Sequence, residues 1–183
     1  MGKAEAGRVS EMETATQIAQ YLLSKDREAR VFAPVDDEHV VAMDGSTRHE
    51  GNVRLNKCLH IAQNLHIAMY GEKLFADDLY ACTIGGVVPV VQDNYALLRK
   101  GVQLDSPLAD GDVERFLDRF SDIYDHAPLD ELVEISREDP EWVEKSALAH
   151  GQQKMDSLNH IEDYKEQYED AVYVFTHENF GVG

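Results

Sequence analysis

Residues 52–71 read NVRLNKCLHIAQNLHIAMYG and carry the clearest helical pattern in the chain. Their main apolar residues recur at intervals of three or four, which is the spacing of one helix face: Leu55, Leu59, Ala62 and Met69, with His66 on the same stripe. Gly71 follows this run, and glycine takes the left-handed conformation at the end of a helix without steric cost. We expect a long amphipathic helix that ends at Gly71.

Similar patterns on both sides of this segment predict further helices. Residues 11–24 and 110–124 each carry an apolar stripe at helical spacing, and residues 155–168 form the last expected helix. Three prolines suit the first turn of a helix, because proline fixes the backbone angle that a helix start requires: Pro89, Pro128 and Pro140. The sequence therefore predicts a mainly α protein, with a single compact helical domain over residues 11–170.

One short region before the long helix has a different period. Residues 30–34 and 39–43 are β-prone runs on either side of the turn-like pair Asp36-Asp37. We expect a small β-hairpin or an ordered loop here, inserted over about residues 25–51.

A second β-prone run lies in the C-terminal tail, residues 171–183. Residues 171–176 are rich in valine and aromatic side chains, which favours a C-terminal strand or an extended arm. Such an arm either packs back onto the hairpin near Val40 or adds a strand to the sheet of a partner. Packing back is the expected arrangement for an ordered single domain.

The formal net charge is −18 and is unevenly distributed. Residues 1–104 hold 11 Lys and Arg against 14 Asp and Glu, whereas residues 105–183 hold 6 against 21. An acidic surface repels nucleic-acid phosphates and attracts cationic partners, although charge excess alone also serves solubility. We expect no direct nucleic-acid binding.

The cysteines and the N-terminus indicate the compartment. Residues 1–8 lack the apolar run of a secretory signal, and no stretch of the sequence approaches the length of a membrane span. Cys58 and Cys82 stand alone in apolar surroundings without CxxC spacing, which is typical of buried thiols in a reducing compartment. We expect a soluble cytoplasmic protein that does not contact a membrane.

A longer pattern extends from Arg54 to Pro89. Its parts are LNKCLHIAQ at residues 55–63, His66, Tyr70-Gly71, Leu74-Phe75 and Gly85-Gly86-Val87-Val88-Pro89. In order and spacing this pattern resembles the signature of the Panacea (SocA-like) antitoxin domain. Residues 129–142, which end in a Pro-Glu-Trp sequence, are similar to the closing segment of that family, so the resemblance covers about residues 15–142.

The resemblance implies an antitoxin of a bacterial or prophage toxin–antitoxin pair, which neutralises its toxin by direct binding. The alternative within the family is an adaptor that delivers the toxin to a cytoplasmic protease. Neither role needs a catalytic site. The residues that carry the motif, either as structural or as partner-binding residues, are Leu55, Lys57, Gln63, His66, Gly71, Phe75, Gly85, Gly86, Pro89 and Trp142.

The acidic second half of the chain, residues 105–183, suggests where a cationic toxin would dock. Many toxins that act on RNA, nucleotides or DNA replication carry basic surfaces, which an acidic helix face complements. The face of residues 110–124 opposite the Phe116 and Phe120 stripe is acidic. We expect a toxin-facing rim made of Asp112, Glu114, Asp118 and Asp122.

Catalytic and metal-binding interpretations find less support in the sequence. His60 and His66 could ligate a metal together with Cys58, Cys82 and Asp77-Asp78, but the two histidines lie six residues apart and point to different faces of a helix. No phosphate loop, dinucleotide fingerprint or nucleophile elbow occurs. We expect no catalytic residue, cofactor or metal ligand, and keep an acid–base or metal-dependent enzyme as the less favoured alternative.

Three motif residues have simpler structural interpretations. His66 fits a hydrogen-bonded, partly buried histidine on the helix seam. Lys57 is expected to pack its aliphatic stem while its ammonium reaches water or pairs with an acid. Trp142 is first a core anchor and only second an interface hot spot.

Overall fold

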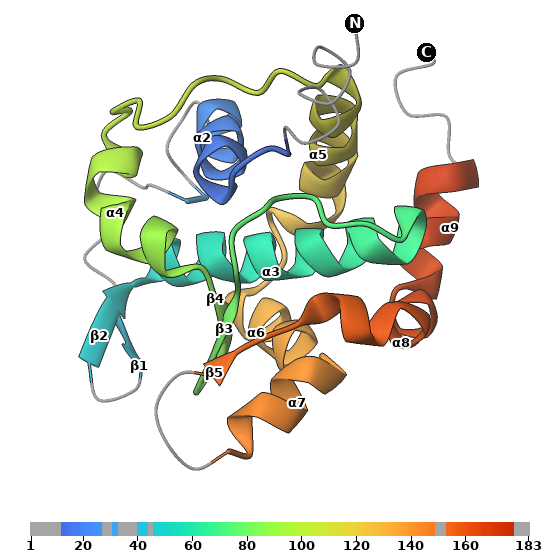
Figure 1. The fold of residues 1–183 in the computed structure, drawn as a ribbon. Helices are drawn as coiled ribbons and strands as arrows, with labels where there is room; N and C mark the ends of the chain where they lie inside the picture. The colour runs from blue at the N-terminus through green and yellow to red at the C-terminus, as the bar shows by residue number, and fades with distance from the viewer. Residues whose placement is uncertain (1–11, 27–30, 33–39, 44–45, 149–152, 178–183) are drawn as a thin grey trace, which may run out of the picture.

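The computed structural model describes residues 12–26, 31–32, 40–43, 46–148 and 153–177, and it shows a mainly helical protein built around one central helix (Figure 1). The central helix is α3 (Glu50–Tyr70). On one side of α3 lie α2 (Ala15–Lys25), α4 (Pro89–Arg99) and α5 (Gly111–Tyr124). On the other side lie α6 (Leu129–Arg137), α7 (Pro140–Ser146), the 3-10 helix η1 (Ser157–His160) and α8 (Ile161–Gln167), and α9 (Glu169–His177) packs near its C-terminal end. The expected mainly α class is confirmed.

The helix boundaries follow the local signals. Thr14 and Gln17 form a reciprocal capping box at the start of α2, with each side chain bonded to the backbone of the other residue. Pro89 occupies the first turn of α4, and Gly71 ends α3 in the left-handed conformation with φ 72°. Pro89 and Gly71 thus confirm the expected start of α4 and the expected end of α3, whereas α2 begins at Ala15 and not at residue 11 as expected.

α3 is buried on almost every face. From residue 51 to residue 68 only Arg54 is partly exposed. The buried set therefore includes the polar side chains of α3 as well as its apolar stripe: Asn52, Asn56, Lys57, His60, Gln63 and Asn64. The expected helix is present, but it is more enclosed than its single apolar stripe indicates, because neighbouring elements cover both faces.

The N-terminal hairpin is present with a different pairing from the expected one. β1 (Val40–Met43) pairs antiparallel with β2 (Ser46–His49), with Met43 opposite Ser46. The two residues between the strands are Asp44 and Gly45, the dipeptide type that most favours two-residue hairpins. The expected turn at Asp36-Asp37 and most of the β-prone run at 30–34 lie outside the described residues, which include only residues 31–32 of that segment.

A second, three-stranded antiparallel sheet was not expected from the sequence. Its order is β4 (Gly85–Val87), β3 (Tyr80–Cys82) and β5 (Gln153–Lys154). β4 packs beside α3 and α6, so this sheet carries the glycine pair of the motif against the central helix. The segment at 155–168 also differs from a single helix, because it begins as η1 and continues as α8.

The C-terminal strand is the clearest error of the sequence interpretation. Residues 171–176 lie within α9, not in a strand or extended arm. Phe175 is buried against Phe116 of α5 with ring centroids 5.4 Å apart, and Arg119 donates a hydrogen bond to the carbonyl oxygen of Phe175. The packing of Phe175 against α5 thus overrides the β propensity of residues 171–176. The described part of the tail docks within the same chain, on α5 and not on the hairpin near Val40.

Every helix in the described part of the chain is too short or too polar to cross a bilayer, including the long central helix α3.

Candidate functional site

Three buried polar side chains meet where α3 faces α6 and α7. The Nδ1 atom of His60 lies 2.6 Å from the Oγ of Ser136, and its Nε2 lies 2.6 Å from the Oδ2 of Asp139. The backbone N–H of Gly86 also donates to the Ser136 Oγ, at 3.0 Å. Together with Asn64 and Tyr164, these residues are called the buried polar centre below.

The hydrogen-bond partners assign the protons in the buried polar centre. Ser136 accepts from the Gly86 N–H and donates its hydroxyl proton to Nδ1 of His60, so His60 carries its proton on Nε2 and donates to Asp139. Asp139 also accepts from the Asn64 amide at 2.9 Å and from the Tyr164 hydroxyl at 2.7 Å. The backbone N–H of Glu141 is a fourth donor, at 2.8 Å, and makes Asp139 the N-cap of α7.

Burial and hydrogen bonding act in opposite directions on the Asp139 carboxyl. Burial alone would raise the pKa of Asp139, but the donors from His60, Tyr164 and Asn64 hold its pKa below the ordinary value. Burial beside this carboxylate raises the pKa of the Tyr164 hydroxyl. The centre therefore holds an ionised carboxylate surrounded by donors.

The order Ser136, His60, Asp139 has the connectivity of a catalytic triad, but the burial opposes nucleophilic catalysis. Ser136 is 1% exposed, and His60 and Asp139 are 0% exposed. A Cβ atom added at Gly86 would lie 2.6 Å from the His60 ring, so the β4 backbone is pressed directly against the histidine. A nucleophile must reach its substrate. This arrangement leaves no space beside Ser136 for one, and its evident role is to hold α3, β4, α6 and α7 together.

Lys57 extends the buried polar centre toward the glycine pair. Its ammonium donates to the carbonyl oxygen of Gly86 at 2.7 Å, and the residue is 0% exposed. The expectation that the ammonium reaches water is therefore wrong, because β4 closes over the side chain. Gly85 has φ +123° and lies against Ser136, so both glycines of the motif are required by backbone geometry and by close packing.

Gln63 and His66 secure the segment that follows α3. The Gln63 carbonyl oxygen accepts from the backbone N–H groups of Leu74 and Phe75, and its amide donates to the carbonyl oxygen of Phe75. His66 donates from Nδ1 to the Glu72 carbonyl oxygen at 2.7 Å, and burial lowers its pKa. His66 is thus hydrogen-bonded and largely buried, as expected.

The motif residues therefore build the scaffold. Leu55 and Phe75 are 0% exposed in the core, and Trp142 is 8% exposed with its indole N–H donating to the Cys82 carbonyl oxygen at 2.7 Å. Cys58 and Cys82 are both buried free thiols, and burial raises the pKa of Cys58. His60 and His66 are bonded elsewhere, so the structure does not bring them together with the cysteines into a metal site.

The acidic rim expected on α5 is only partly available to a partner. Asp118 accepts from the Tyr21 hydroxyl and from the Lys25 ammonium, both at 2.6 Å, and so joins α5 to α2. Burial would raise the pKa of Asp118, but these two donors hold it below the ordinary value. Asp112 pairs with Arg115 on its own helix. Among the described residues, Glu114 and Asp122 have no cationic partner, so they are the two members of the rim that remain unpaired.

A groove beside α6 has an acidic edge that is more continuous than the rim on α5. It has a volume of about 700 Å³, and its apolar lining residues, called its floor below, are Val53, Ile84, Leu129, Val133 and Trp142. Asp130, Glu134 and Glu138 follow one edge at intervals of four residues, which places them on one face of α6. No lysine or arginine in the described ranges pairs with these three carboxylates. We call this feature the acidic groove.

The acidic groove contains one cation. The Arg137 guanidinium lies 5.1 Å from the centre of the Trp142 ring, in a cation–π contact. Val143, next to Trp142 on α7, is 53% exposed. The groove thus combines an aromatic side chain, an apolar floor and a negatively charged edge, a composition suited to a basic, partly apolar protein segment.

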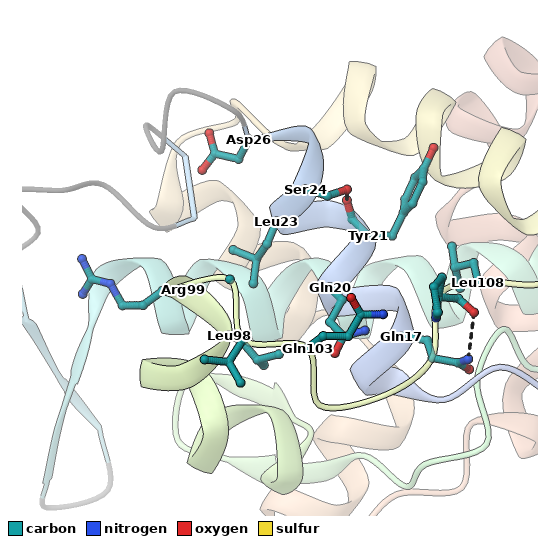
Figure 2. A pocket seen from close by; sticks show the side chains of 13 residues that line it. Gln17, Gln20, Tyr21, Leu23, Ser24, Asp26, Leu98, Arg99, Gln103 and Leu108 are labelled. Carbon is teal, nitrogen blue, oxygen red and sulfur yellow. Dashed lines mark hydrogen bonds between the residues drawn. The ribbon is translucent and has the colours of Figure 1, made fainter.

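A second hollow of about 310 Å³ lies between α2, α4 and the loop that follows α4 (Figure 2). Its amide side chains are already used by that loop: Gln17 donates to the carbonyl oxygens of Ser106 and Pro107, and Gln20 bonds to the backbone of Leu104 and Asp105. These bonds fix the loop to α2. The two glutamine side chains of α2 are therefore committed to holding the loop.

The buried carboxyl group of Asp125, at the C-terminal end of α5, should make the stability of the protein depend on pH. It is 7% exposed, its Oδ1 has no hydrogen-bond partner among the described residues, and burial raises its pKa from 3.8 to about 6. A raised pKa in the folded state gives stability that is complete below the unfolded pKa and is lost as the pH rises through the folded pKa. We expect a loss of roughly 2 to 3 kcal/mol between about pH 4 and pH 7 from this group.

Urea unfolding of the wild type and of Asp125→Asn over this pH range measures the effect. The variant should lack this part of the decline and be the more stable protein near pH 7, whereas Asp122→Asn, at an exposed position of the same helix, should follow the wild type. Equal pH slopes in Asp125→Asn and the wild type would contradict the assignment.

No model of a known protein family, no curated protein and no solved structure matches this chain.

Proposed function

We propose that this chain is a cytoplasmic antitoxin that neutralises a basic protein toxin by binding it at the acidic groove. The observation that carries the proposal is the pairing of an apolar floor containing Trp142 with the unpaired carboxylates of Asp130, Glu134 and Glu138. Electrostatic complementarity steers a cationic partner to such a surface, and burial of apolar area then holds it.

The distribution of polar groups also supports binding over catalysis. The side chains with the connectivity of a nucleophile, a base and an acid are enclosed and bonded to one another in the buried polar centre. The carboxylates of Asp130, Glu134 and Glu138 are instead exposed at a groove. A protein that acts through its surface needs this arrangement, whereas an enzyme needs reactive groups that its substrate can reach.

The sequence pattern supports the antitoxin role specifically. The residues that resemble the Panacea signature lie in the core, at the positions that join α3 to the β3–β4 hairpin and to the segment after α3. They are scaffold residues and would be common to proteins that bind different toxins. The partner surface would then lie outside the motif, where the acidic groove is.

Growth assays test the proposal. Each gene that flanks the gene for this chain is expressed alone and together with the chain. The proposal expects that one neighbour arrests growth alone, that it encodes a basic protein, and that co-expression restores growth and yields a complex that co-purifies. If growth is restored only in cells that contain a cytoplasmic protease, and the toxin level falls, the chain is an adaptor and does not neutralise the toxin directly. Growth arrest by no neighbour would contradict the proposal.

A further inference from the structure

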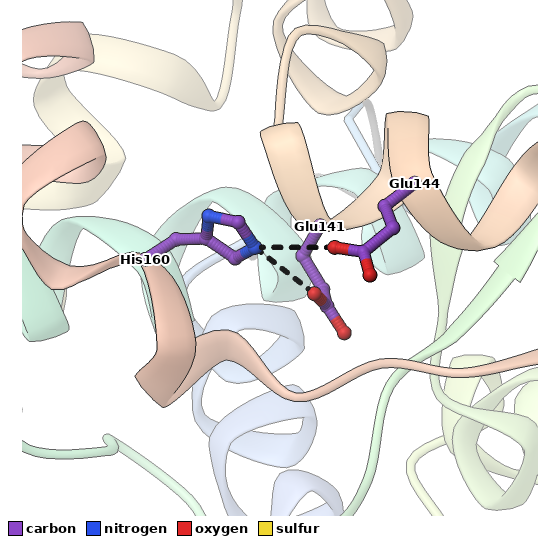
Figure 3. Close-up of side chains that lie close together, drawn as sticks. All are labelled: Glu141, Glu144 and His160. Carbon is purple, nitrogen blue, oxygen red and sulfur yellow. Dashed lines mark hydrogen bonds and ion pairs between the residues drawn. The ribbon is translucent and has the colours of Figure 1, made fainter.

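A cluster of side chains between α7 and η1 has no role in the buried polar centre or in the acidic groove. Glu141 and Glu144 from α7 point toward His160 at the end of η1 (Figure 3). The Nε2 atom of His160 lies 3.0 Å from the Oε1 of Glu141 and 3.8 Å from the Oε2 of Glu144. One ligand atom from each side chain lies within 4.8 Å of the other two.

The 3.0 Å between Nε2 of His160 and Oε1 of Glu141 matches two atoms that share a metal ion, and the 3.8 Å to Oε2 of Glu144 is a few tenths of an ångström longer. Zinc binds imidazole nitrogen and carboxylate oxygen at about 2.1 Å, so two of its ligands at tetrahedral or octahedral angles lie about 3.0 to 3.5 Å apart. Glu144 is exposed, with 62% of its side chain accessible, so water can reach the same position and complete the coordination.

The groups around the cluster hold its ligand atoms in place. The Asp163 carboxylate lies 3.0 Å from Nδ1 of His160, which fixes the imidazole with Nε2 toward the two glutamates. The backbone N–H of Asp156 donates to the Oε2 of Glu141 at 2.5 Å and leaves Oε1 to face His160. A carboxylate behind a histidine, and a bonded second oxygen on a ligand carboxylate, are typical of the outer shell of metal sites.

The charge balance favours a divalent cation. Among the described residues, three carboxylates surround His160, while the ammonium of Lys145 lies 3.5 Å from Glu141 and 3.8 Å from Glu144 and so neutralises one of these charges. Glu141 is 0% exposed. Lys145 compensates only part of the negative charge of the three carboxylates, and a cation at this position would supply the rest.

We propose that Glu141, Glu144 and His160 bind a divalent transition-metal ion of the zinc class. One nitrogen and two oxygen donors suit this class better than they suit calcium or magnesium, which prefer oxygen ligands alone. The ion would clamp α7, which carries Trp142, to η1 and α8. The proposal does not depend on the antitoxin role.

Calorimetric titration of the chelator-treated full chain with zinc sulfate tests this site. The wild type should bind about one zinc ion with high affinity and melt at a higher temperature in its presence. Glu144→Gln should lose this binding, and Asp163→Asn should weaken it about 10- to 100-fold, because that variant removes the outer-shell partner of His160. Both positions are exposed, so both variants should fold.

Glu162→Gln is the matched control, because Glu162 is exposed, lies next to Asp163 and pairs with Lys165 instead of His160. It should bind zinc like the wild type. Two results would overturn the proposal: a wild type that binds no zinc, which would leave the cluster as an ion pair of protonated His160, or Glu144→Gln and Asp163→Asn proteins that bind zinc as tightly as the wild type.

Discussion

Replacing Asp139 with asparagine is expected to lower the free energy of unfolding by about 3 kcal/mol or more, a large part of the stability of a domain of this size. All four groups that face the carboxylate are donors: His60, Asn64, Tyr164 and the backbone N–H of Glu141. An asparagine of the same shape replaces one acceptor oxygen with an NH₂ group. Whichever way the amide is turned, two buried donors then face another donor.

Urea unfolding near neutral pH measures this loss. Glu138→Gln is the matched control, since Glu138 is the neighbouring residue and is exposed, and it should change stability by less than about 0.5 kcal/mol. An Asp139→Asn protein as stable as this control would show that the buried polar centre does not hold the fold.

Reversing the charge of the acidic groove is expected to have the largest effect on partner binding. The double variant Glu134→Lys and Glu138→Lys changes two exposed carboxylates on one edge of the groove and leaves its apolar floor intact. The association rate with the toxin should fall by about tenfold or more, because steering becomes repulsion, and the difference should shrink as salt screens the charges. Stopped-flow or surface-based kinetics at two salt concentrations measure both effects.

The α5 rim provides the comparison for this variant. Glu114→Lys and Asp122→Lys make the same change of net charge at exposed positions of another helix. If the partner binds at the acidic groove, this second variant should slow association less than the α6 variant does. An equal or larger effect of the α5 variant would place the toxin on the α5 rim instead.

Local sequence signals were enough to predict most of the helices. The apolar stripe and Gly71 gave the course and end of α3, and the three prolines marked the starts of α4, α6 and α7. The pairing of β1 with β2 was missed, although the sequence contains a signal for it. That signal is Asp44-Gly45, a dipeptide that favours two-residue hairpin turns. α9 was missed because its helical form depends on packing of Phe175 against α5, which a β-prone composition does not reveal.

The candidate sites depend on contacts that are distant in sequence. His60 lies 76 residues from Ser136 and 79 from Asp139, and no spacing rule connects them. The polar side chains of α3 are buried only because β4, α6 and α8 cover them. The acidic rim on α5 was expected from the charge pattern alone, and the bonds of Asp118 to Tyr21 and Lys25 could not be predicted because they depend on the packing of α2 against α5. Glu141 and Glu144 share a helix face, but their meeting with His160 could not be read from the sequence.

Titration of the purified toxin with this chain, followed by calorimetry and by the toxin activity that remains, tests the binding role most directly. The account predicts that heat release and neutralisation saturate together at one fixed molar ratio, with no further change over time, because each antitoxin molecule occupies a toxin surface. Complete inactivation of the toxin by a small fraction of an equivalent, increasing with time and without a stable complex, would instead identify this chain as an enzyme.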